Sequence, residues 1–145
     1  MGCVNLAEDI QKFGMTFCIP NTRPADGHKQ AFSGLYDVSL AIVKNSAIVG
    51  NELTANNKRL YIITGANQGG KTAFLRSLGQ AQLMAQGGML AGAVSFDAHI
   101  CRGIFSHFRK EEDAAMKSGK LDEELSRMNE IAGHFESSSL VLLNE

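Results

Sequence analysis

The sequence predicts an α/β fold with a mostly parallel core sheet flanked by helices. An apolar, strand-like run at residues 60–63 precedes a glycine-rich turn and a helical pattern, and a later helical pattern precedes a second apolar run at 140–143. Strand–turn–helix followed by helix–strand is βαβ connectivity, which places parallel strands in one sheet. The chain has 145 residues, of which 44% are hydrophobic and 20% charged, so it can form one domain with a packed core.

The first third of the chain carries weaker signals. Residues 1–13 predict the end of a helix, because Leu6, Ile10 and Phe13 recur at spacings of four and three and Gly14 follows. A short β-like run at 15–19 comes next. We expect a surface loop over 21–34, which is polar and rich in turn-forming residues, and a meander of short strands over 35–49.

The pattern sharpens from residue 59. The run 60–63 is apolar and β-branched, as is typical of a strand buried on both faces of a parallel sheet. Residues 65–70 predict a glycine-rich turn, and 71–86 predict a helix that Gly87 and Gly88 end.

The remaining third predicts β-like segments at 93–96 and 103–108, then a charged loop at 109–120. An amphipathic helix should follow, because apolar residues recur at helical spacing in Leu121, Leu125, Met128, Ala132 and Phe135. Residues 140–143 predict a second buried strand.

Composition excludes several classes of protein. Fourteen Lys and Arg against fifteen Asp and Glu give a net charge of −1, which argues against a domain whose main task is gripping nucleic acid. Four scattered histidines and three cysteines without a C-x-x-C pair argue against a zinc site and indicate reduced thiols in a cytoplasmic protein. No apolar run approaches the ~20 residues of a membrane-spanning helix, so no membrane partner is expected.

One motif carries recognisable chemistry. Residues 65–72 read GANQGGKT and fit G-x-x-x-x-G-K-[ST], the phosphate-binding P-loop or Walker A motif. Its glycines let backbone N–H groups surround a phosphate, Lys71 brings a full charge to the β- and γ-oxygens, and the Thr72 hydroxyl is placed to bind Mg²⁺. The predicted phosphate contacts are Gly65, Ala66, Asn67, Gln68, Gly69, Gly70, Lys71 and Thr72. The alternative, a plain turn before an ordinary helix, is disfavoured by the position of the motif between a strand and a helix.

P-loop enzymes need a second element, an apolar strand that ends in a carboxylate beside the metal. Residues 140–145 (LVLLNE) have that form. Asn144 stands where an aspartate is expected and keeps an acceptor oxygen without the charge, while Glu145 stands where a residue that activates water would be. The predicted metal ligands are therefore Thr72 and Asn144, and Lys71 and Glu145 are predicted catalytic residues. The alternative is a core strand with a polar end.

The stretch 63–93 (ITGANQGGKTAFLRSLGQAQLMAQGGMLAGA) strongly resembles the ATPase domain of MutS-type DNA mismatch-repair proteins, whose P-loop runs ITGPNMGGKST. Supporting resemblances lie at 17–20, 47–51 and 140–145. The resemblance implies a P-loop NTPase fold of the ABC/MutS type with an N-terminal antiparallel β part. It also implies that residues 1–145 are one incomplete ATPase domain that stops at the Walker B strand. Within it, 1–13 would end a lever-type helix, 14–58 would form the β part, and 59–145 would run from the P-loop to Walker B.

The same resemblance implies site roles and partners. Asn67 matches the family residue that faces the γ-phosphate, and Asn51 matches a further family asparagine. Ile48 aligns with the aromatic residue that stacks on adenine, so here the contact would be apolar packing. The expected ligands are ATP or ADP with Mg²⁺, the expected partner is a second copy or a MutS-like subunit, and DNA would be held by other domains of the parent protein.

Two alternatives to an active ATPase remain open. Asn144, Ile48 and an altered family signature near 118–121 are compatible with a degenerate nucleotide-binding or dimerisation module that hydrolyses little ATP. A small-molecule or nucleoside kinase is disfavoured, because nothing resembles an acceptor site or an arginine-rich lid.

Overall fold

The computed structural model describes residues 2–24, 29–56, 58–66, 68–108 and 120–144. Contacts divide the chain into two compact units, Met1–Ile100 and Cys101–Glu145, and each unit is considered by itself. In the described ranges no helix is both long and apolar enough to cross a membrane.

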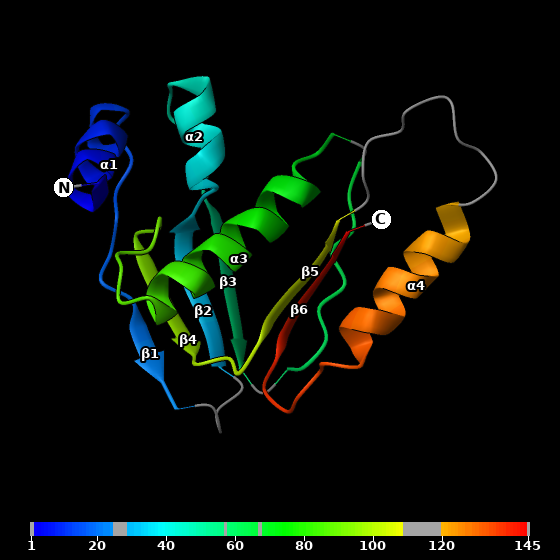
Figure 1. The fold of residues 1–145 in the computed structure, drawn as a ribbon. Helices are drawn as coiled ribbons and strands as arrows, with labels where there is room; N and C mark the ends of the chain where they lie inside the picture. The colour runs from blue at the N-terminus through cyan, green and yellow to red at the C-terminus, as the bar shows by residue number, and fades with distance from the viewer. Residues whose placement is uncertain (1, 25–28, 57, 67, 109–119, 145) are drawn as a thin grey trace. The chain divides into compact units, whose positions relative to one another are not determined.

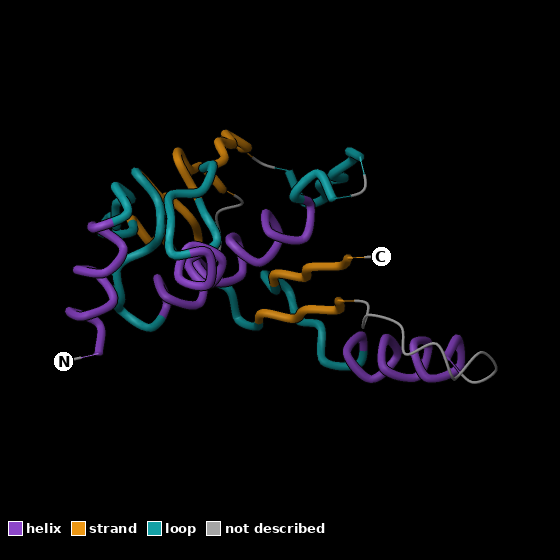
Figure 2. The backbone as a smooth tube through the Cα atoms, turned by 90° about the horizontal axis from the view of Figure 1, so that it is seen from above, coloured by secondary structure: helices purple, strands orange, loops and turns teal. Residues whose placement is uncertain are grey.

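The first unit is built on a four-stranded mixed sheet. The strand order is β1-β4-β2-β3, with β1 parallel to β4 and β2 antiparallel to both β3 and β4. Helix α3 crosses one face of this sheet (Figure 1), and the view from above places the strands on one side of α3 (Figure 2). The elements of this unit are α1 (Gly2–Lys12), β1 (Asn21–Arg23), β2 (Lys29–Leu35), α2 (Val38–Lys44), β3 (Asn51–Asn56), α3 (Lys71–Gln86) and β4 (Ser95–His99).

Aromatic side chains join the sheet to α3. Phe32 of β2 lies with its ring centre 6.0 Å from Phe74 of α3 and 6.3 Å from Phe96 of β4. Both Phe32 and Phe96 are buried, as are Leu75 and Leu78 on the sheet side of the helix. This apolar contact fixes α3 against the sheet, and a second buried cluster (Ile10, Tyr36, Val38 and Ala41) joins α1 to α2.

The second unit is a small βαβ arrangement. Strand β5 (Ile104–Phe108) pairs in parallel with β6 (Leu140–Asn144), and α4 (Lys120–Ala132) lies between them in the chain. The Arg127 guanidinium of α4 donates to His107 Nδ1 at 3.0 Å and to the Phe108 carbonyl at 3.0 Å, which ties the helix to β5. The parallel pair agrees with the predicted α/β class, but the partner of β6 is β5, whereas the sequence predicted parallel strands at 60–63 and 140–143 in one sheet.

Several predicted elements are confirmed. The helix at the N-terminus ends before Gly14, which has a φ of +73°, and the helix over 71–86 is present with Gly87 as its C-cap. Strands β4, β5 and β6 and helix α4 correspond to their predicted segments within a few residues. Of the expected charged loop at 109–120, residues 109–119 lie outside the described ranges.

Three predictions for the first unit are wrong. The supposed loop over 21–34 contains β1 and most of β2, and the supposed meander over 35–49 contains α2. The supposed buried strand at 60–63 pairs with no strand in the described ranges, and Leu60 and Ile62 are 77% and 80% exposed. An apolar run becomes a buried strand only where neighbouring strands pair with its backbone and helices or another layer cover its faces. The four-stranded sheet is also mixed, whereas the sequence predicted a mostly parallel sheet.

Candidate functional site

The candidate site is the loop at 65–70 and the first turn of α3. Helix α3 has sixteen residues and begins at Lys71, and Gly70 occupies its N-cap with a φ of +85°. As a glycine, Gly70 provides no side-chain hydrogen bond to this end. The first N–H groups of a helix have no partner within it, and they form a partly positive end that suits an anion.

Glycines allow the loop to turn this tightly. The Gly69 amide donates to the Ala66 carbonyl at 3.0 Å, and a Cβ added at Gly69 would lie 2.8 Å from that oxygen. Gly70 and Gln68 both have positive φ values, +85° and +65°, which in L residues other than glycine carry strain. The loop is therefore a compact turn, and a residue larger than glycine at position 69 would force its backbone to change.

Lys71 folds back over this turn. Its ammonium donates to the Gly65 carbonyl at 2.5 Å and to the Ala66 carbonyl at 2.9 Å. Thr72 and the described residues of the loop are exposed. A cation, a helix N-terminus and a hydroxyl therefore share one accessible turn, and this set of donors suits a phosphate ester.

The other two predicted nucleotide-binding residues, Ile48 and Asn51, belong to the same unit. Ile48 is partly buried and packs against the cluster of Ile10, Tyr36, Val38 and Ala41, and Asn51 begins β3, where its side-chain amide donates to the Leu35 carbonyl at 3.4 Å. Neither contact tests the predicted apolar contact of Ile48 with adenine or the predicted nucleotide-binding role of Asn51, so both roles stay predictions.

The remaining predicted residues lie in the second unit or outside the described ranges. Asn144 ends β6 in the second unit, opposite Phe108, while Asn67 and Glu145 lie outside the described residues. Among the residues that the structure describes, no group of three His, Cys, Asp or Glu side chains could hold a metal ion. Mg²⁺ nevertheless needs only one or two protein oxygens beside substrate phosphates, so a single hydroxyl such as that of Thr72 fits it.

Sequence reasoning missed a buried polar network beside the loop helix. Asp37, 2% exposed, caps α2 and binds Arg76 and Gln80 of α3. A signal was present, because Asp37 directly precedes apolar residues at helical spacing (Val38, Ala41 and Ile42), which is typical of a helix start.

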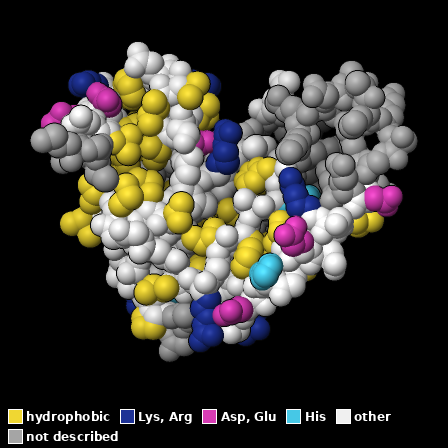
Figure 3. Space-filling view, in the orientation of Figure 1, with side chains coloured by type: hydrophobic (Ala, Val, Ile, Leu, Met, Phe, Trp, Pro, Cys, Tyr) yellow, Lys and Arg dark blue, Asp and Glu magenta, His cyan; other side chains and the backbone are white. Residues whose placement is uncertain are grey.

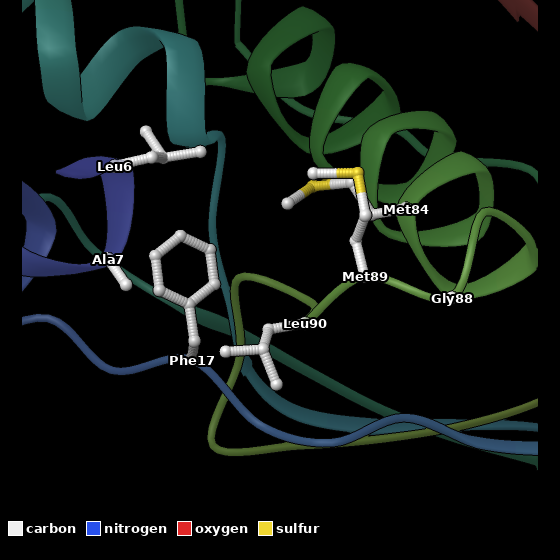
Figure 4. Close-up of a pocket in the computed structure, with 7 residues that line it drawn as sticks. All are labelled: Leu6, Ala7, Phe17, Met84, Gly88, Met89 and Leu90. Atoms are coloured by element: carbon white, nitrogen blue, oxygen red, sulfur yellow. The ribbon is translucent and has the colours of Figure 1, made fainter. Parts of the chain in front are cut away.

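An apolar cavity of about 200 Å³ lies elsewhere in the first unit. Figure 4 shows Phe17 and Leu6 facing Met84 and Met89 across it, with Ala7, Gly88 and Leu90 completing the lining. Hydrophobic side chains also gather on the visible face around α1 and α2 (Figure 3). Met84 is thirteen residues along α3 from Lys71, which is about 20 Å in a helix. The cavity lining contains no charged side chain, so this cavity does not suit a phosphate group.

Comparison with known proteins gives consistent matches. Residues 61–145, more than half of the chain, match the family described as MutS domain V. The chain is 39% identical over 104 residues to the DNA mismatch repair protein MutS of Trichormus variabilis, 71% of this chain and 12% of that protein. It is 32% identical over 122 residues to the MutS of Clostridium beijerinckii, 83% of this chain and 13% of that protein. It is 40% identical over 86 residues, 59% of this chain, to the MutS of Acaryochloris marina. The chain spans 10 to 13% of the length of these relatives.

Proposed function

Because this chain belongs to the MutS family, we propose that it is the ATP-binding module of a MutS-like DNA mismatch-repair protein. In this proposal residues 65–72 bind the phosphates of Mg²⁺-ATP, and ATP binding and hydrolysis switch the parent protein between DNA-bound states. Mismatch recognition and the contacts to DNA belong to other parts of the parent protein.

The observation that carries the proposal is the loop before α3. A tight turn of glycines leads into the N-terminus of a sixteen-residue helix, where the N-cap Gly70 makes no side-chain hydrogen bond and the first helical residue is Lys71. Backbone N–H groups and the helix dipole favour the β-phosphate at this point. Lys71 now donates to two loop carbonyls, and in the complex its ammonium would move to the β- and γ-oxygens, whose full charges attract it more strongly.

The metal would be held by the Thr72 hydroxyl, with Asn144 as the second predicted ligand. When bound there, Mg²⁺ would supply positive charge that offsets the negative charge of the phosphates. Lys71 stabilises the charge that spreads over the γ-phosphoryl group as water attacks in line, Glu145 orients that water, and Asn67 faces the γ-phosphate. We propose that a second copy or a MutS-like subunit completes this site.

The test measures binding and turnover on the 145-residue chain. We expect saturable binding of Mg²⁺-ATP that ADP displaces. At concentrations where the chain is a monomer, hydrolysis should be no faster than background, because the composite site then lacks its partner. Absence of ATP binding would contradict the nucleotide-binding proposal. Robust turnover that Lys71→Ala abolishes would contradict the composite site.

A second candidate, a switch module that binds ATP and hydrolyses little, is favoured by Asn144, which lacks the charge that an aspartate would bring to the metal. Turnover by the parent protein separates the two candidates. ATP binding without turnover there would support the switch, and turnover would support the ATPase.

A further inference from the structure

Asp37 sits at the centre of a polar network between α2 and α3. Its Oδ1 accepts the Leu40 amide at 3.0 Å and the Gln80 side-chain amide at 3.0 Å, and its Oδ2 accepts Arg76 Nε at 2.9 Å. Gln80 completes the exchange, because its Oε1 accepts the Val38 amide at 3.0 Å. One carboxylate and one carboxamide thus bind two turns of α3 to the first turn of α2.

Burial makes this network costly to break. The Asp37 side chain is 1% exposed, whereas its partner Arg76 is 48% exposed. A carboxylate withdrawn from water is tolerated where each oxygen has a donor, and removing a partner leaves an uncompensated buried charge. The geometry of this junction is therefore strongly held, although Arg76 itself reaches the surface.

The two elements that the network joins lead to the two ends of the proposed nucleotide site. Arg76 and Gln80 follow Lys71 by five and nine residues on one continuous helix. A displacement of the network therefore also displaces residues 65–72, the proposed phosphate loop. Helix α2 ends at Lys44, with Asn45 as its C-cap, and the chain from there carries Ile48, the predicted contact to adenine, and Asn51, a further predicted nucleotide-binding residue.

We infer that Asp37 is a positioning residue which, through Arg76 and Gln80, sets the phosphate loop relative to the segment of Ile48 and Asn51. The inference rests on the proposed function. ATP must reach both ends of such a site at once, whereas inorganic tripolyphosphate needs only the phosphate loop. Loosening the junction therefore weakens ATP binding and leaves tripolyphosphate binding nearly unchanged.

Asp37→Asn tests this inference on the full 145-residue chain. The amide oxygen still accepts the Leu40 amide and caps α2, but its NH₂ group opposes Arg76 Nε, a donor against a donor. Dissociation constants are measured for Mg²⁺-ATP and for Mg²⁺-tripolyphosphate. We expect ATP to bind roughly 2- to 30-fold more weakly, the range found for mutations in coupling networks. Tripolyphosphate should change by less than about twofold.

Two further variants complete the design. Arg76→Met removes the partner from the opposite side and should reproduce the selective loss, which keeps the test decisive if Asp37→Asn does not fold. Arg102→Met is the matched control, because Arg102 is exposed and its ion pair with Glu136, at 3.8 Å, lies within the second unit. It should change neither affinity, while circular dichroism verifies the fold of each variant.

The outcomes separate this inference from the proposed function. If the wild-type chain binds neither probe, the proposed function fails. If both probes bind the wild type and the network variants change both equally or neither, the nucleotide site stands and the positioning role of Asp37 is overturned.

Discussion

Gly69→Ala should weaken nucleotide binding, because the added Cβ would clash with the backbone of the proposed phosphate loop. An added Cβ would lie 2.8 Å from the Ala66 oxygen, and ordinary contact begins at 3.4 Å, so the loop must give way by about 0.6 Å. The obstacle is backbone, and the same carbonyl accepts both the Gly69 amide and the Lys71 ammonium. Overpacking of this kind typically costs ~1–3 kcal/mol. If the bound loop keeps this turn, Mg²⁺-ATP binding weakens by roughly 5- to 150-fold.

Gly65→Ala is the matched control within the same loop. A Cβ at Gly65 would meet only the Lys71 Cγ, at 4.0 Å, which is ordinary contact. Isothermal titration of the wild type and both variants gives the comparison, and Gly65→Ala should change affinity by less than about threefold. Equal affinities for the wild type and Gly69→Ala would refute the argument, because the loop would then not need the tight turn at Gly69 to bind nucleotide.

Two further predictions concern the second unit. Asn144→Asp in the parent protein should tighten ATP binding with Mg²⁺ and not with a chelator, because the added charge attracts the metal and repels bare phosphates; an unchanged Mg²⁺ dependence would show that Asn144 does not face the metal. Burial raises the pKa of the Cys101 thiol from 9.0 to about 11, so iodoacetamide at pH 8 should modify Cys101 far more slowly in the folded chain than in urea. The unfolded chain loses this proton first as pH rises, so the contribution of Cys101 to stability is complete below pH 9 and falls between about 9 and 11. Equal reaction rates in both states would contradict its burial.

The parts of the fold that sequence predicted are those with local causes. Helix α3 follows a glycine-rich turn and ends at Gly87, and α4 carries apolar residues at helical spacing. These signals act within a few residues, so they need no knowledge of the remaining chain. The tight turn at 65–70 was predicted for the same reason, since its motif is continuous in sequence.

The parts that sequence missed depend on distant partners. Strand β2 looked like a loop because Lys29, Gln30 and Ser33 are polar, yet β3 and β4 pair with it on both sides. The run 60–63 looked like a buried strand but has no strand partner in the described ranges. The Asp37 network joins Asp37 to Arg76 and Gln80, which lie 39 and 43 residues further along the chain, and hydrophobic periodicity does not predict contacts at such separations.

The contribution of Lys71 to nucleotide affinity decides whether residues 65–72 bind phosphate. Mg²⁺-ATP is titrated into the wild-type chain and into Lys71→Ala, with Lys44→Ala, which removes a lysine at the end of α2, as the charge control. One charge-assisted contact to phosphate contributes typically ~1.5–3 kcal/mol, so Lys71→Ala should weaken ATP binding at least tenfold while Lys44→Ala leaves it unchanged. Equal affinities for the wild type and Lys71→Ala would contradict the assignment of residues 65–72 as the phosphate-binding loop.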